Sequence, residues 1–240
     1  MPENTAFIQM VLRWIHFVAG ITWIGLLFFF NLVNIRFLKT LDPATRVKVF
    51  PALMKPALFW FRYSAFVTVF AGIWYWMTIV SADLRNARAL HPEEHISGAM
   101  AIGGFFLIWT LAWFLCSLAT MKGRLHILPI LIVYAVIISI ASYAYVSLNS
   151  NGWESNRLLC IGIGGGMGWV MIFNVWGIIW RNAKKLIRWT EQSAADGSAM
   201  PPAAAFLANE NLVVSSANFA LSLPMLFFMG AASHLPLFGL

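Results

Sequence analysis

One histidine lies inside a long apolar stretch, where ionisable side chains are uncommon. The stretch RWIHFVAGITWIGLLFFFN covers residues 13–31 and places His16 one helical turn after Arg13. An ionisable residue within a membrane segment is a functional candidate, and an imidazole buried between helices is a common axial ligand of haem b. Gly20 follows four residues later, so it lies on the same helix face and leaves room for a flat macrocycle. The same pattern also fits an inward histidine that bonds a neighbouring helix beside a packing glycine.

Two further histidines lie at the ends of apolar stretches. His234, in AASHLP, has about the same predicted depth as His16, so the two form a candidate pair of haem ligands. The alternative for His234 is an interfacial histidine near the C-terminus. His126 begins another apolar stretch on the opposite side, so it does not share a haem with either. It fits a ligand of a second, inner haem or, more simply, the start of a helix.

The segment HPEEH at 91–95 also has two interpretations. His91 and His95 have the i, i+4 spacing of a metal clamp, with two glutamates between them. Pro92 at a first helical position, followed by acidic residues that favour the positive end of the helix dipole, is typical of a helix start. We favour the helix start.

A glycine-rich run, GIGGGMGWVM, occupies residues 162–171. A nucleotide-binding loop needs a preceding strand and a solvent-facing turn, whereas this run lies within an apolar stretch. We therefore expect close helix packing through small-xxx-small pairs, with a face packed against a cofactor as the alternative. Four intramembrane amides are expected to bond helices together or to line a polar site: Asn31, Asn34, Asn174 and Asn218.

The composition explains why these residues are expected in a membrane. The 240 residues are 60% hydrophobic and 10% charged, with a mean hydropathy of +0.76, whereas soluble domains average about 25% charged residues. So few charges cannot cover a water-facing surface, which indicates a single multi-span membrane domain over 1–240. Cys116 and Cys160 fall inside apolar runs and are expected to be small packing residues. No C-x-x-C-H motif occurs in these residues, so they attach no c-type haem.

Six stretches reach the roughly 20 mostly apolar residues that a helical span requires. They do not alternate as barrel strands do, so we predict an all-α, polytopic membrane helical bundle with about six transmembrane helices. The spans are expected near 14–35, 58–80, 97–121, 126–148, 158–180 and 211–232. The small-residue, proline-containing segment 190–206 is predicted to be a flexible linker.

The basic residues alternate between the loops of this six-span arrangement. The first, third and fifth loops carry 12 of the 16 Lys and Arg residues. The positive-inside rule therefore places these loops in the cytoplasm and both termini outside. Contact between the loops and anionic headgroups of the lipid bilayer accounts for the net charge of +7, so no nucleic acid partner is needed.

Four long blocks of the chain resemble one known family. They are HFVAGITWIGLLFFFNLVN at 16–34, LDPATRVKVFPALMKPALFWFRYSAFVTVFAGIW at 41–74, IFNVWGIIWRNAKKLI at 172–187 and NFALSLPMLFFMGAASHLP at 218–236. They resemble the membrane domain of the bacterial membrane-bound urate hydroxylases, the urate oxidase N-terminal domain family. The resemblance implies an oxidoreductase of the bacterial inner (cytoplasmic) membrane. Characterised members carry a C-terminal cytochrome c and oxidise urate to 5-hydroxyisourate, with electrons leaving through that cytochrome.

The resemblance and the histidines together lead to two main hypotheses. The sequence ends at Leu240, soon after SHLP, so we expect a short form that passes electrons to a separate cytochrome c. Electron exit on the outer side fits haem b held by His16 beside Gly20, with His234 as the candidate second ligand. The alternative is a non-catalytic transmembrane subunit of a larger respiratory or photosynthetic complex, with the glycine-rich helix as a contact surface. A third hypothesis is a metal or small-ligand carrier that uses the HPEEH loop and the outer histidines.

Overall fold

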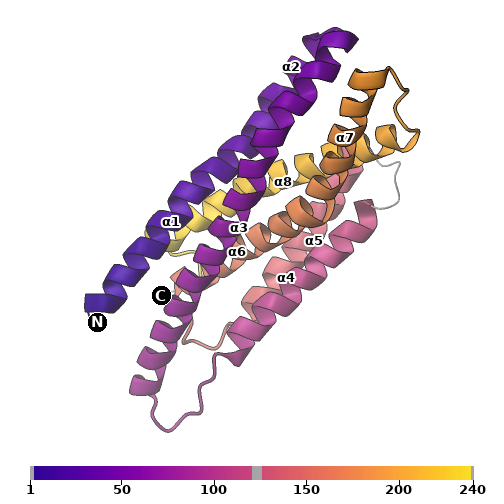
Figure 1. The fold of residues 1–240 in the computed structure, drawn as a ribbon. Helices are drawn as coiled ribbons and strands as arrows, with labels where there is room; N and C mark the ends of the chain where they lie inside the picture. Colours follow the sequence, from indigo (N-terminus) through magenta and orange to yellow (C-terminus); the bar gives the residue numbers. More distant parts are fainter. Residues whose placement is uncertain (1–2, 121–125, 239–240) are drawn as a thin grey trace.

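The computed structural model describes residues 3–120 and 126–238, and its regular elements are all helical (Figure 1). In chain order they are α1 (Glu3–Phe28), the π-helical η1 (Phe29–Asn34), α2 (Ile35–Thr40), α3 (Pro43–Leu90), α4 (Ala99–Thr120), α5 (Ile127–Leu148), α6 (Asn156–Asn174), the π-helical η2 (Val175–Ile179), α7 (Trp180–Asp196) and α8 (Ala203–His234). No strand occurs in the described ranges. The predicted all-α class is therefore confirmed.

In the part of the chain that the structure describes, six helical segments are long and apolar enough to cross a membrane, which confirms the predicted number of spans. Two of these segments run through a π-helical turn: α1, η1 and α2 form one, and α6, η2 and α7 form another. Large apolar side chains on the outside of the bundle, such as Phe66, Phe70 and Trp74 of α3, are about half exposed. Lipid is the solvent that suits such a surface, so the chain is a multi-pass membrane protein in contact with the bilayer.

The first basic loop is much shorter than the sequence predicts. Only Leu41 and Asp42 separate α2 from α3, so most of the basic stretch is helical. Asp42 caps α3, because its side chain accepts a 3.0 Å hydrogen bond from the Thr45 N–H, and Pro43 follows at the first helical position. Hydrogen bonding by Thr45, chiefly through its side chain, holds the pKa of Asp42 below its ordinary value. These capping contacts explain why the helix starts well before the predicted span at 58–80.

The predicted linker at 190–206 is also largely helical. Helix α7 continues to Asp196, and Gly197 ends it in a left-handed conformation with φ of 72°. The Gly197 N–H donates to the Ser193 carbonyl, which is the usual way in which a glycine closes a helix. Since α8 begins at Ala203, only six residues, 197–202, lie outside helices.

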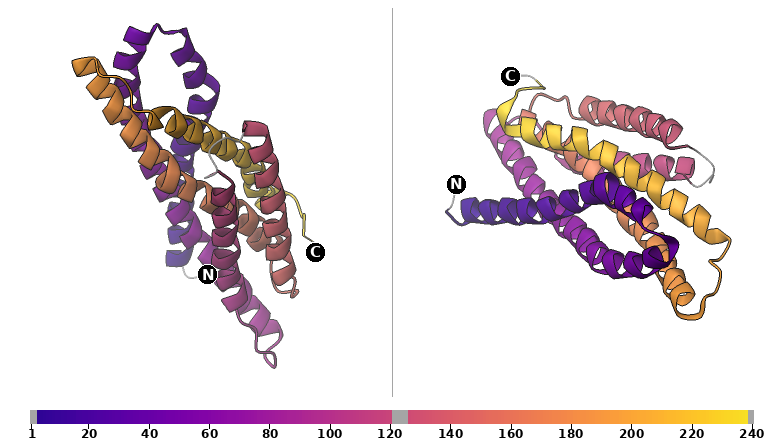
Figure 2. Two further views of the ribbon diagram at one scale, coloured as in Figure 1. Left: turned by 90° about the vertical axis from the view of Figure 1, so that its right-hand side faces the viewer. Right: turned by 90° about the horizontal axis from the view of Figure 1, so that it is seen from above.

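Both chain termini lie toward one end of the bundle (Figures 1 and 2). The α2–α3 turn and the α7–α8 turn lie at the opposite end, and the basic residues around them carry most of the positive charge. An even number of spans, here six, places both termini on the same side of the membrane. By the positive-inside rule the end with the two turns faces the cytoplasm, so the end with the termini is called the outer end below.

Helix α6 forms the centre of the bundle. It belongs to the span Asn156–Asp196, in whose most apolar stretch 72% of the residues are buried. The corresponding fraction in the other spans is 22–39%. The glycines of α6 allow close contact, since a Cβ at Gly162 would overlap the Tyr145 ring and one at Gly166 would overlap the Trp109 indole. The glycine run is thus confirmed as a helix-packing surface.

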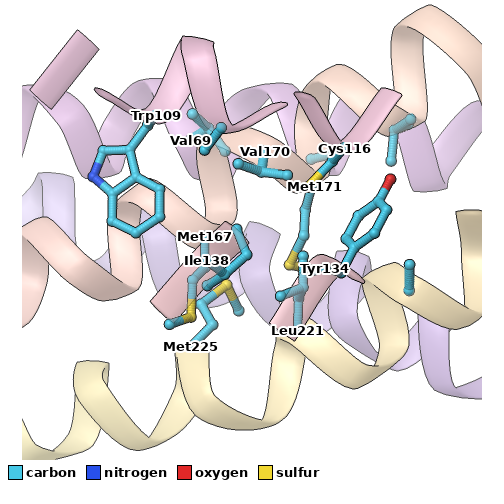
Figure 3. Packing of buried hydrophobic residues seen from close by; sticks show 14 of the residues in the cluster. Val69, Trp109, Cys116, Tyr134, Ile138, Met167, Val170, Met171, Leu221 and Met225 are labelled. Carbon is cyan, nitrogen blue, oxygen red and sulfur yellow. The ribbon is translucent and has the colours of Figure 1, made fainter. Parts of the chain in front are cut away.

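Side chains from the surrounding helices complete the core around α6 (Figure 3). Met167 and Met171 of α6 lie among Cys116 of α4, Tyr134 of α5 and Leu221 of α8. Both cysteines of the chain are buried and free. Their expected role as packing residues is confirmed.

Candidate functional site

A cavity of about 370 Å³ lies between α1, α3, α6 and α8. Its volume falls in the range of small-molecule sites, and its walls are mainly apolar. Residues on its rim, such as Phe17 and Ile21 of α1 and Leu226 of α8, are exposed. The cavity is therefore open to the lipid-facing side of the bundle.

His16 lines this cavity, and a backbone carbonyl fixes its ring. Its Nδ1 lies 2.8 Å from the carbonyl oxygen of Thr68 in α3. Because a carbonyl can only accept, Nδ1 carries the proton and Nε2 keeps its lone pair. Among the described residues nothing donates to Nε2. An imidazole held in this way is the arrangement that most metal-bound histidines share.

Five glycines line the cavity, and Gly25 of α1 is one of them. Gly72 of α3 lies against the imidazole, since a Cβ there would sit 2.8 Å from two ring atoms of His16. Gly20 lies on α1, one turn beyond His16, while Gly165 and Gly168 come from α6. The sequence predicts the closeness of His16 and Gly20. The contribution of α3 and α6 depends on how the helices are rotated against one another.

Two methionines of α8 form another wall of the cavity. Met225 and Met229 are one turn apart and both lie against the glycine run of α6. The Met225 sulfur would lie 3.6 Å from a Cβ at Gly168, and Met229 would lie 3.3 Å from one at Gly164. Thioether sulfur is a known axial ligand of haem iron. Sequence reasoning missed these residues, although their i, i+4 spacing was visible.

A buried donor without a partner also belongs to the cavity wall. Trp23 lies two turns beyond His16 and is 1% exposed. Its indole N–H forms no hydrogen bond within the part of the chain that the structure describes. The buried indole N–H groups of Trp109, Trp113 and Trp176 are also unpaired within the described residues, so this feature does not by itself indicate a bound ligand.

The outer end of the cavity is basic. Arg13 of α1 and Arg157 of α6 line it together with Tyr75 of α3. Their guanidinium carbons lie 5.9 Å and 6.0 Å from the centre of the Tyr75 ring. Sequence reasoning noted Arg13 only as a neighbour of His16, and nothing in the sequence placed Arg157 near it.

The other histidines lie outside the cavity lining. His234 is exposed in the last turn of α8, although the adjacent Ser233 is a lining residue. His126 is exposed and directly precedes α5. The structure therefore brings His16 and Gly20 together in one site, and the haem-ligand roles of His234 and His126 stay predictions.

The HPEEH segment does not start a helix, so that interpretation is wrong. Helix α3 ends at Leu90 and α4 begins only at Ala99. Arg88 holds the segment in a turn, since its side chain donates two hydrogen bonds, 2.7 and 3.0 Å long, to the Ile96 carbonyl. These long-range side-chain bonds compete with helix capping, and the sequence pattern does not reveal them. The side chains of His91, Glu93 and Glu94 are exposed with their ligand atoms within 4.8 Å of one another.

The intramembrane amides bond helices together. Asn174 donates to Asn218 at 2.8 Å and joins α6 to α8, and Asn31 donates to Ser215 at 3.0 Å and joins η1 to α8. A pair that sequence reasoning missed lies nearer the cytoplasmic end, where buried Asn182 donates to the carboxylate of buried Glu210. These contacts attach both π-helical spans to α8.

Comparison with known proteins gives one match. A family model described as urate oxidase N-terminal matches residues 41–239. The matched range begins after α2, so His16 and Gly20 lie outside it, whereas Thr68, Gly72 and the walls from α6 and α8 lie inside it. No curated protein matches the chain, and no solved structure matches it.

Proposed function

The chain belongs to the urate oxidase N-terminal family, and from this premise we propose that it is a membrane redox domain that holds haem b in the cavity beside His16. The electrons pass to a cytochrome c on the outer side. The membrane is the bacterial inner (cytoplasmic) membrane. Family membership supports the redox chemistry of urate hydroxylation, and the geometry of the cavity supports the cofactor.

The orientation of His16 is the observation that carries this proposal. The Thr68 carbonyl 2.8 Å from Nδ1 selects the tautomer whose Nε2 is free to ligate iron. A histidine that only tied α1 to α3 would need this one hydrogen bond and no cavity beside it. Here the same ring lies at a cavity with flat glycine walls.

The residues around the cavity fit a flat, largely apolar macrocycle. Gly20, Gly72, Gly165 and Gly168 present backbone instead of side chains, which allows close approach to a planar group. Haem b, when bound, supplies one-electron redox chemistry that no side chain of this site provides. His16 would hold it on the α1 side, and Met225, Met229 and His234 are the candidates for a second ligand from α8.

The position of the cavity suits electron exit on the outer side. Its lining includes Arg13 in the first half of α1 and Ser233 in the last turn of α8, and it includes no residue of the α2–α3 or α7–α8 turns. Conversion of urate and water to 5-hydroxyisourate releases two electrons and two protons. A c-type cytochrome accepts one electron at a time, so two acceptor molecules are reduced for each urate.

Urate-dependent reduction of cytochrome c tests this function. Right-side-out membrane vesicles that contain the protein receive ferricytochrome c, and the visible absorbance of the reduced cytochrome is followed after urate is added. We expect reduction that depends on both the protein and urate and that is lost in His16→Ala. His91→Ala is the matched control and should keep the activity, because His91 is exposed and lies outside the cavity. Haem-loaded wild-type protein that gives no urate-dependent reduction would contradict urate as the electron donor.

A further inference from the structure

We infer that Arg13 and Arg157 form a carboxylate clamp at the outer end of the cavity and bind the two acidic side groups of the macrocycle. This inference rests on the proposed function, because it assigns the polar edge of the same ligand. It adds a binding role for two residues that neither the family match nor the sequence pattern assigns.

The two arginines come from different spans and meet at one aromatic ring. Arg13 belongs to α1 and Arg157 to the first turn of α6, yet both guanidinium groups lie about 6 Å from the centre of the Tyr75 ring of α3. Like charges repel, so two cations placed on one ring need an anion between them or free access to water. Arg13 is exposed and Arg157 is partly exposed, so water reaches both. All three residues line the cavity, so an anion held between the two guanidinium groups would lie at its outer end.

No carboxylate of the described residues neutralises either arginine. Neither guanidinium group forms a salt bridge or a hydrogen bond with the rest of the described chain. Glu154, the acid nearest Arg157 in sequence, accepts from the backbone and side chain of Asn151, and Asp83 accepts from the Ser155 N–H. Within the described residues, both guanidinium groups are therefore left without an ion-pair partner at the cavity.

The register of the helices sets the clamp at a suitable distance from His16. Arg13 precedes His16 by three residues, a rise of about 4.5 Å along α1 toward the outer end. Tyr75 follows Gly72, the residue against the imidazole, by the same spacing on α3. Haem b carries its two carboxylates on one edge, so a macrocycle near His16 would direct that edge at the two arginines. Arginine binds carboxylates with two parallel hydrogen bonds, which favours it in this role.

Porphyrin selectivity tests the clamp directly. The full chain is purified without haem from a haem-deficient host and titrated with haem b or with its dimethyl ester, in which both carboxylates are neutral. The ester cannot form the charged contacts to the two arginines. We expect each lost contact to weaken its binding to the wild type at least about tenfold relative to haem b. Arg13→Gln and Arg157→Gln should each reduce this preference, and the double variant should bind both porphyrins equally. Arg85→Gln removes an exposed outer arginine away from the cavity and should keep the preference.

The outcomes separate the clamp from the proposed function. Wild-type protein that binds haem b and its ester equally would contradict the clamp while leaving haem binding intact. A preference retained in the double variant, together with lost urate-dependent reduction, would assign the arginines to a free organic anion and would also overturn the clamp. Failure of the wild type to bind either porphyrin would contradict both the proposed function and the clamp.

Discussion

His16→Ala is expected to remove haem from the purified protein while leaving the six-helix bundle in the membrane. The substitution deletes the nitrogen ligand, and loss even of groups that only support a metal ligand lowers affinity by about 10–100-fold. The fold should survive, because the imidazole is only partly buried and its one hydrogen bond to Thr68 contributes about 1 kcal/mol. Haem content per protein, measured as the pyridine haemochrome, checks this result.

Other histidines provide the controls for this experiment. His91→Ala should keep wild-type haem content, because His91 is exposed and lies outside the cavity. A comparison of His234→Ala with Met229→Leu tests which of these α8 residues is the second haem ligand. Only substitution of the true ligand should change the visible spectrum of the haem. Haem retained in His16→Ala would contradict the ligand assignment, however the other variants behave.

Gly166→Ala is expected to destabilise the bundle more than any other single methyl added to the glycine run. The new Cβ would overlap the indole of Trp109, which is fully buried and cannot move aside without displacing α4. Overpacking of this kind costs about 3 kcal/mol. The unfolding temperature in detergent should then fall by roughly 6–12 °C.

Gly165→Ala is the matched control one residue earlier. Its nearest neighbours would lie 3.8 Å or more from the new Cβ, which is ordinary van der Waals contact. Alanine also favours a helix over glycine by about 1 kcal/mol, so stability should stay the same or rise slightly. Fluorescence-monitored thermal unfolding of both variants gives the comparison. Equal stability of the two would contradict the account in which α6 packs through Gly166.

The number and type of the elements could be predicted because lipid imposes simple rules on them. A span needs a long apolar run and the loops at one end are basic, and both features can be read from the sequence alone. The lengths of the helices could not be predicted in the same way. Helix α3 contains Pro51 and Pro56 and a basic segment that hydropathy treats as loop, yet the Asp42 cap and the helical neighbours extend it to Pro43.

The candidate site was predictable only where it lies on a single helix. His16 and Gly20 share a face of α1, so their spacing identifies them. Thr68, Gly72 and Met229 join the site through the rotation and crossing of α3 and α8, which local spacing does not encode. The error at HPEEH has the same origin, because Arg88 holds that turn from the preceding helix.

A dithionite-reduced minus oxidised visible spectrum of the purified wild-type protein tests the central claim most directly. The account predicts the α band of a b-type haem, which should disappear in His16→Ala purified in the same way. A flat spectrum from well-folded wild-type protein would contradict haem binding. His16 would then be a residue that ties α1 to α3, and the subunit of a larger membrane complex would become the better explanation.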